Sequence, residues 1–125
     1  MRKKVLLVDD DLDLQDIIKG ALELEGYEVL VASNGKEALN MLKEQKDNVE
    51  IGCIILDLMM PVMDGTEMLD LLRKDPKWSN IPVIISTAKG TVDKSDVEKS
   101  QAVIKKPMKI ETLYDVIEKY SKPTH

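Results

Sequence analysis

The sequence predicts an α/β domain built on a doubly wound, five-stranded parallel sheet. Five short apolar segments alternate along the chain with segments whose apolar residues recur at helical spacing. This alternation is typical of a parallel sheet with helices on both faces and right-handed connections. The 125 residues suffice for one core and are too few for two ordinary domains, so we expect residues 1–125 to form a single domain.

The segment that ends at Asp57 is the predicted centre of the sheet. Its apolar run starts at Ile51 and is rich in isoleucine, as in parallel strands that are covered on both faces. Pro61 prevents the strand from continuing, and Asp64-Gly65 is a turn signal. The other predicted strands are Val5–Val8, Tyr27–Ala32, Ile81–Thr87 and Ala102–Lys105.

The helices are predicted from apolar spacing and from boundary residues. Gly26 is a natural C′ residue for the first helix, and Asp75-Pro76 ends the third. Asp11 is expected to cap the first helix. Helical spacing marks the segments 14–22, 38–42, 66–73 and 110–120.

The fourth helix is expected to be short or irregular. Segment 89–101 should hold it, but the only aliphatic residues there are Val92 and Val97. Ser95 and Glu98 match the capping-box pattern, which would start the helix at about Asp96. A segment with so little apolar surface to bury belongs to the less stable part of a fold, so we expect it to be stunted or mobile.

The composition of the chain indicates which class of partner it binds and in which cellular compartment it acts. Eighteen basic residues against 23 acidic ones give a net charge of −5 without a basic run, which is a poor basis for direct binding of nucleic acid. Cys53 is the single cysteine, lies in the central apolar run and suits a reducing compartment. Neither a signal peptide nor an apolar run of membrane-spanning length is present, so we expect a cytoplasmic protein without membrane association.

Polar residues stand at the carboxyl ends of four of the five predicted strands. They are Asp9 and Asp10, then Asp57, then Thr87, then Lys106. Each has an ordinary interpretation alone, as a strand-end acid, a strand threonine or a surface lysine. Because the carboxyl ends of parallel strands meet at one edge of the sheet, the whole set indicates one site.

This set of side chains suits phosphoryl transfer. Three carboxylates in one pocket need a cation or a proton, and oxygen ligands favour a hard divalent ion, above all Mg²⁺. Asp57 would attack phosphorus and form an aspartyl phosphate. Mg²⁺ and Lys106 would neutralise the developing charge, and Thr87 would hydrogen-bond the arriving group.

The chain resembles the response-regulator receiver domains of two-component signalling, which have the flavodoxin-like (βα)5 fold of chemotaxis regulators. The matching motifs are Val8-Asp9-Asp10, Leu56-Asp57-Leu-Met-Met-Pro61 with Asp64-Gly65, Ser86-Thr87-Ala88 and Lys106-Pro107.

The resemblance implies a role for each residue of the acidic group. Asp57 would be the phosphoacceptor and also face the metal. Asp10 would bind Mg²⁺ directly, Asp9 mostly through water, and the backbone carbonyl of Met59 would complete the protein ligands.

The resemblance also implies roles around the phosphoryl group. Thr87 would be the switch hydroxyl and Lys106 the phosphate-binding lysine, followed by a cis peptide bond to Pro107. By analogy, Met59 and Lys89 would influence water access and the hydrolysis rate. The family is a signalling module rather than an enzyme class, although it assists its own phosphorylation and dephosphorylation.

The chain departs from the family pattern near its fifth strand. Val103 stands where the family usually has Tyr or Phe, and the chain contains no Phe. Ser100-Gln101 replaces the frequent Gly-Ala, and the stretch from Thr87 to Lys106 looks about one helical turn short. We therefore expect a switch without an aromatic flip and a remodelled output face.

The expected phosphoryl donor is a sensor histidine kinase or a histidine phosphotransfer protein, and the downstream partner is unknown. The chain could be a stand-alone regulator or phosphorelay shuttle, because only a few residues follow the last predicted helix. It could equally be a receiver module of a hybrid kinase or a longer regulator. A third alternative is a pseudo-receiver that mediates contacts without phosphorylation.

Two other site classes are disfavoured. Asp9, Asp11 and Asp13 alternate as in a calcium loop, but Leu14 and Gly20 stand where that loop needs Gly and Glu. A haloacid-dehalogenase-type phosphatase could use Asp9 and Asp11, but the chain is short for that fold and the other motifs would have no role in it.

Overall fold

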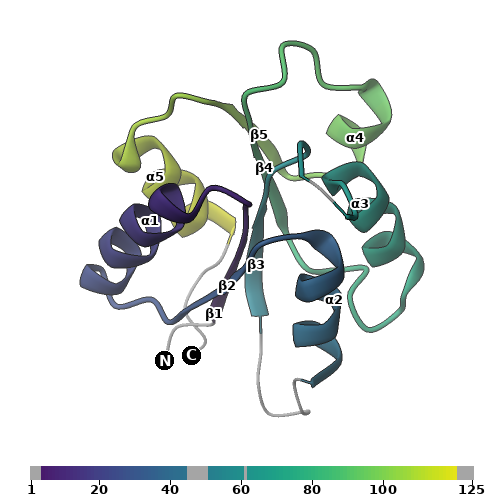
Figure 1. Cartoon of the computed structure of the whole chain (residues 1–125), viewed down its shortest axis with the longest axis horizontal. Helices are drawn as coiled ribbons and strands as arrows, with labels where there is room; N and C mark the ends of the chain where they lie inside the picture. Colours follow the sequence, from purple (N-terminus) through teal and green to yellow (C-terminus); the bar gives the residue numbers. More distant parts are fainter. Residues whose placement is uncertain (1–3, 45–50, 61, 121–125) are drawn as a thin grey trace.

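The computed structural model describes residues 4–44, 51–60 and 62–120. Five strands, each parallel to its neighbours, form one sheet in the order β2-β1-β3-β4-β5 (Figure 1). The predicted five-stranded parallel sheet is therefore confirmed. The strands are β1 (Lys4–Val8), β2 (Val29–Ala32), β3 (Ile51–Leu56), β4 (Val83–Thr87) and β5 (Ala102–Lys105).

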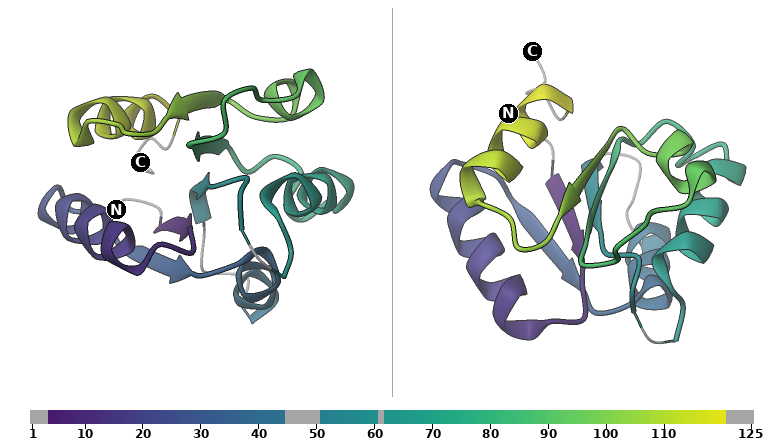
Figure 2. Two further views of the ribbon diagram at one scale, coloured as in Figure 1. Left: turned by 45° about the horizontal axis from the view of Figure 1, so that its top comes forward. Right: turned by 90° about the horizontal axis from the view of Figure 1, so that it is seen from above.

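The described residues form five helices, which cover both faces of the sheet. Helices α1 and α5 lie on one face, and α2, α3 and α4 lie on the other, which Figure 2 shows most clearly. This arrangement confirms the doubly wound fold. The helices are α1 (Leu12–Leu24), α2 (Gly35–Glu44), α3 (Gly65–Lys74), α4 (Lys94–Glu98) and α5 (Ile110–Tyr120).

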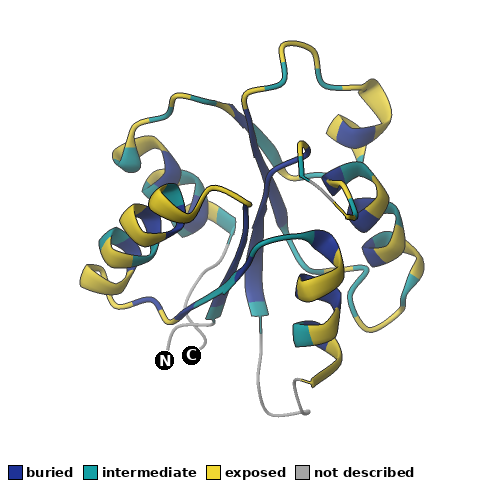
Figure 3. Cartoon of the chain, in the orientation of Figure 1, coloured by how far each residue is buried: buried dark blue, intermediate teal, exposed yellow. Residues whose placement is uncertain are grey.

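Alternate residues of the central strands divide the core in two. Leu6 and Ile54 point into the cluster beneath α2 and α3, whereas Leu7 and Ile55 point into the cluster beneath α1 and α5. β3 is buried over almost its whole length, as its apolar run predicts (Figure 3). Cys53 is fully buried in the second cluster, as expected.

Local signals place the ends of α1 correctly. The Asp11 side chain caps the helix by accepting a hydrogen bond from the Leu14 amide at 3.1 Å. Gly26 follows the helix with φ 91°, and the Tyr27 amide donates to the Leu22 carbonyl at 3.1 Å. The Tyr27 amide thus closes the helix, which explains why β2 begins at Val29 rather than at Tyr27 as predicted.

The fourth helix is as short as predicted, with five residues, but its predicted start is wrong. It begins at Lys94 with Asp93 as N-cap, and the Asp93 side chain makes no capping hydrogen bond. Ser95 therefore does not cap the helix. Asp96 lies inside it and is fully buried against α3, where it accepts a hydrogen bond from the Thr66 hydroxyl at 2.8 Å. The capping-box pattern therefore gives the wrong start, because Asp96 lies within the helix and is bound to α3.

None of the helices in the described ranges is long and apolar enough to cross a membrane.

Replacing Gly65 with Ala should destabilise the fold by about 2 kcal/mol, because the added methyl overpacks a close contact. An ideal Cβ there would lie 2.4 Å from the backbone oxygen of Asp57 and 2.6 Å from the Cα of Leu58. Urea unfolding measures the loss. Gly20→Ala is the matched control, since its Cβ would meet nothing within 4 Å, and it should gain about 1 kcal/mol of helix stability. Equal effects of the two changes would contradict the prediction.

Candidate functional site

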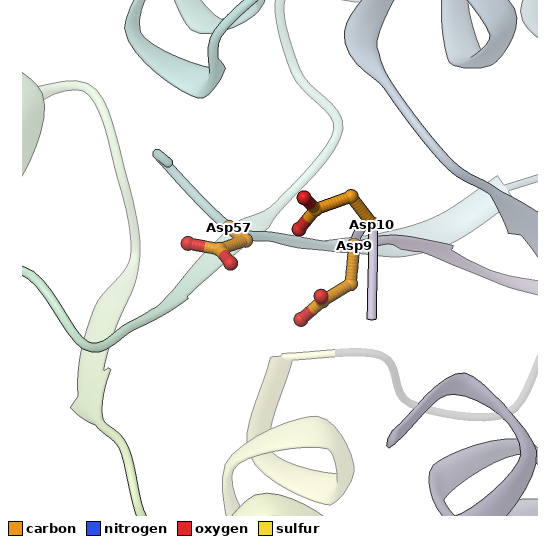
Figure 4. Close-up of side chains that lie close together, drawn as sticks. All are labelled: Asp9, Asp10 and Asp57. Atoms are coloured by element: carbon orange, nitrogen blue, oxygen red, sulfur yellow. The ribbon is translucent and has the colours of Figure 1, made fainter. Parts of the chain in front are cut away.

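Three carboxylates meet at the carboxyl ends of β1 and β3. Oxygens of Asp9, Asp10 and Asp57 lie within 4.8 Å of one another (Figure 4). The sheet fixes the backbones of two of them, because the Asp9 amide donates to the Ala32 carbonyl and the Asp57 amide to the Val8 carbonyl, each at 3.0 Å. The structure therefore brings together the three acids that the sequence indicates.

The three acids differ in their exposure to solvent. Asp9 and Asp57 are only 2% and 6% exposed, whereas Asp10 is an exposed residue. Buried carboxylates need a compensating cation or hydrogen bonds to remain charged. The two inner acids have both kinds of partner.

Lys106 is the cation between the inner acids. Its Nζ lies 2.6 Å from Asp9 Oδ2 and 3.0 Å from Asp57 Oδ2. Burial by itself would lower the pKa of Lys106, but the hydrogen bonds to Asp9 and Asp57 and the negative charges of these two carboxylates together hold that pKa above the usual lysine value. The ammonium is thus kept charged beside Asp57. The peptide bond from Lys106 to Pro107 is cis, as predicted.

Backbone amides supply the remaining hydrogen bonds to the inner carboxylates. The amide of Met59 donates to Asp57 Oδ1 at 3.0 Å, and the amide of Asp11 donates to Asp9 Oδ1 at 2.9 Å. Each carboxylate therefore has one oxygen bound to its own loop and the other bound to Lys106. This arrangement holds both side chains in fixed orientations.

Sequence reasoning missed Gln15, which supports the acidic loop from α1. Gln15 is buried, and its Nε2 donates to the backbone carbonyl of Asp9 and to Ser33 Oγ at 3.3 Å. It therefore joins the ends of β1 and β2. A usable signal existed, because Gln15 shares the inward helix face with Ile18 and Leu22, where a polar residue needs a partner.

Thr87 lies at the adjoining end of β4 and is fully buried. Its Oγ1 accepts a hydrogen bond from the Lys89 amide at 3.2 Å, and its carbonyl accepts one from the Lys106 amide at 2.9 Å. The backbone of Thr87 therefore helps to position Lys106, whereas the Thr87 hydroxyl is bound to the loop that follows β4.

A depression of about 530 Å³ opens beside the acidic cluster. Its lining includes Asp10, Met59, Met60, Thr66 and Lys89. Met59 and Lys89 thus border the opening, and their influence on water access and hydrolysis stays a prediction. A small ligand can enter the depression from solvent and reach Asp10, the exposed acid.

The donor set fits a hard divalent cation. Three carboxylate oxygens within 4.8 Å match the oxygen ligands that Mg²⁺ prefers, and the open side leaves room for the water molecules that it retains. Asp10, Asp9 and Asp57 are the residues that would hold the ion.

The family model described as "Response regulator receiver domain" matches residues 5–118. The chain belongs to this family. The resemblance read from the sequence motifs is therefore confirmed, and a receiver domain is a module of two-component signalling.

Curated relatives of this receiver are regulators that are much longer. It is 46% identical over 87 residues to the transcriptional regulatory protein CpxR homolog of Haemophilus influenzae. The aligned residues make up 70% of this chain and 35% of that protein. It is 41% identical over 91 residues to the probable transcriptional regulator ycf27 of Guillardia theta, and these residues make up 73% of this chain and 33% of that protein. The chain thus spans about a third of the length of these relatives.

Solved receiver structures have the same fold. The chemotaxis protein CheY4 of Vibrio cholerae has a TM-score of 0.82 and 26% identity, over 96% of this chain and 99% of that one. The response regulator TrrA of Thermotoga maritima, in complex with Mg²⁺ and BeF, has a TM-score of 0.81 and 29% identity, over 94% and 98%. The flavodoxin-like arrangement of this receiver is therefore confirmed.

Replacing Lys106 with Met should lower the free energy of unfolding by about 3 kcal/mol in metal-free buffer, because two buried carboxylates lose their cation. Adding Mg²⁺ should restore more stability to this variant than to the wild type. Urea unfolding with chelator and with Mg²⁺ measures both effects. Lys109→Met is the control, since Lys109 is exposed. A Lys106→Met protein as stable as the control without metal would contradict the prediction.

Proposed function

We propose that residues 1–125 form one receiver domain that accepts a phosphoryl group on Asp57 with the help of Mg²⁺. The observation that carries this proposal is the cluster of three carboxylates within 4.8 Å, with the Lys106 ammonium bound to two of them. Family membership supports it, because phosphoacceptor chemistry is what the resemblance implies.

The carboxylate of Asp57 is the nucleophile. Its oxygen attacks phosphorus, the new P–O bond replaces the P–N bond of a phosphohistidine, and the imidazole leaves with the electron pair and takes up a proton. The Met59 amide and the Lys106 ammonium hold the two carboxylate oxygens, so the nucleophile is oriented before the donor arrives.

Lys106 and Thr87 would stabilise the transferred group. The ammonium of Lys106 already lies at Asp57 and would neutralise a phosphoryl oxygen. The Thr87 hydroxyl would leave the Lys89 amide and donate to another phosphoryl oxygen. This change of partner would alter the loop that follows β4.

Mg²⁺, when bound, neutralises the oxygens on which charge develops. Asp10 would be its direct ligand and Asp9 would act mostly through water, while Asp57 and the Met59 carbonyl complete the protein ligands. The burial of Asp9 and the exposure of Asp10 are consistent with this division.

The proposed partners are proteins. The donor would be a sensor histidine kinase or a histidine phosphotransfer protein, and phosphorylation would change contacts with a downstream protein. The net charge of −5 argues against direct contact of this domain with DNA. The named relatives are transcriptional regulators about three times as long, so the domain could serve within a longer regulator or a hybrid kinase, as well as alone or as a shuttle. We place its action in the cytoplasm, away from the membrane.

Incubation with acetyl phosphate and Mg²⁺ tests the proposal, with intact-protein mass as the readout. We expect one phosphoryl adduct on the wild type, none on Asp57→Asn, and none with chelator. Asp10→Asn should need a higher Mg²⁺ concentration, because it removes the exposed ligand. A wild-type protein that stays unmodified under conditions that label another receiver would overturn the proposal in favour of a contact-only module.

A further inference from the structure

One face of α3 is joined to α4 by polar contacts. Thr66, Asp70 and Arg73 recur at helical spacing along α3. The Thr66 hydroxyl donates to Asp96 Oδ2 at 2.8 Å, Asp70 pairs with the Lys99 ammonium, and Arg73 Nε donates to the Lys99 carbonyl at 2.8 Å. Helix α4 and the residue after it are therefore attached to α3 by specific hydrogen bonds, and α4 itself contributes little apolar surface.

Asp96 is the unusual member of this set. It is fully buried, and its Oδ1 has no hydrogen-bond partner among the described residues. A buried carboxylate oxygen without a partner is costly, so such a group in a native protein calls for an explanation. Among the described residues, the Asp96 side chain accepts a hydrogen bond only from Thr66, so a movement of that hydroxyl acts directly on the middle of α4.

Thr66 is in turn coupled to the backbone beside Asp57. It directly follows Gly65, whose amide donates to the Leu58 carbonyl at 3.0 Å. A Cβ on Gly65 would lie 2.4 Å from the Asp57 carbonyl oxygen, so the start of α3 is in direct contact with the strand end that carries Asp57. Thr66 also lines the depression beside the acidic cluster.

The route from the site to α4 is thus continuous. It runs from Asp57 through Gly65 and Thr66 to Asp96. Val103 on β5, by contrast, is a small side chain that packs against the core beneath α2 and α3. Without an aromatic ring there, Val103 offers no bulky group that could alternate between two positions.

We propose that Asp96 is a positioning residue through which the Thr66 hydroxyl transmits the state of Asp57 to helix α4. This inference rests on the proposed function, because it names the structural response to phosphorylation. A change of the Asp57 loop shifts the start of α3, and the Thr66–Asp96 hydrogen bond moves α4 with it. The surface that changes includes Val97, which is 46% exposed on α4 and can contact a protein partner.

The test is hydrogen exchange of the backbone amides of residues 94–101, with and without beryllium fluoride plus Mg²⁺ as the phosphoryl mimic. In the wild type, we expect the mimic to change exchange in this segment by about fivefold, the equilibrium equivalent of one net hydrogen bond. Asp96→Leu removes the acceptor and should abolish this change. Asp96→Asn retains an acceptor oxygen and should preserve it.

Asp93→Leu is the matched control on the same helix, since Asp93 is exposed and its side chain makes no capping bond. It should respond as the wild type does. Intact mass after acetyl phosphate treatment and circular dichroism verify that each variant folds and is modified on Asp57. If Asp96→Leu is misfolded, the double variant Thr66→Val with Asp96→Leu, which leaves no orphan donor, replaces it.

The outcomes separate the two proposals. A wild type that is never modified on Asp57 overturns the proposed function, and this inference with it. If the wild type is modified on Asp57 but hydrogen exchange in residues 94–101 of the Asp96→Leu variant still responds to the mimic, this inference alone is overturned. A modified wild type whose α4 exchange does not respond also overturns it.

Discussion

The site depends on one interaction, in which the ammonium group of Lys106 is shared by the buried carboxylates of Asp9 and Asp57. Asp9 and Asp57 come from neighbouring strands and would repel each other at this depth without Lys106. Lys106 reaches them from the far edge of the sheet, because it follows β5. The pairing therefore requires the carboxyl ends of β1, β3 and β5 to lie at one edge of the sheet, as they do when the strands are parallel.

The close contact of Gly65 with the Asp57 loop serves both fold and site. It allows α3 to begin against the end of β3, so the helix starts beside the acidic cluster. The same contact leaves little room for the loop to move independently of the helix. Stability and communication between the site and α3 thus depend on one packing constraint.

Helix α4 shows where local reasoning reaches its limit. Its shortness follows from composition, since Val92 and Val97 provide too little apolar surface for a longer packed helix. The residue at which α4 starts does not follow from the sequence in the same way, because the capping-box pattern depends only on residues close together in the chain. Asp96 is buried by its contact with Thr66, thirty residues earlier, and no local pattern contains that pairing.

The amino-acid sequence was enough to predict the alternation of strands and helices, the buried central strand and the polar residues at four strand ends. These features follow from periodicity and from the rule that parallel strands place their ends at one edge. The three-dimensional structure was needed to show that Lys106 binds both Asp9 and Asp57, that Gln15 supports the acidic loop, and that Asp96 faces Thr66. Those contacts join residues far apart in the chain, and their geometry depends on how the helices pack against the sheet.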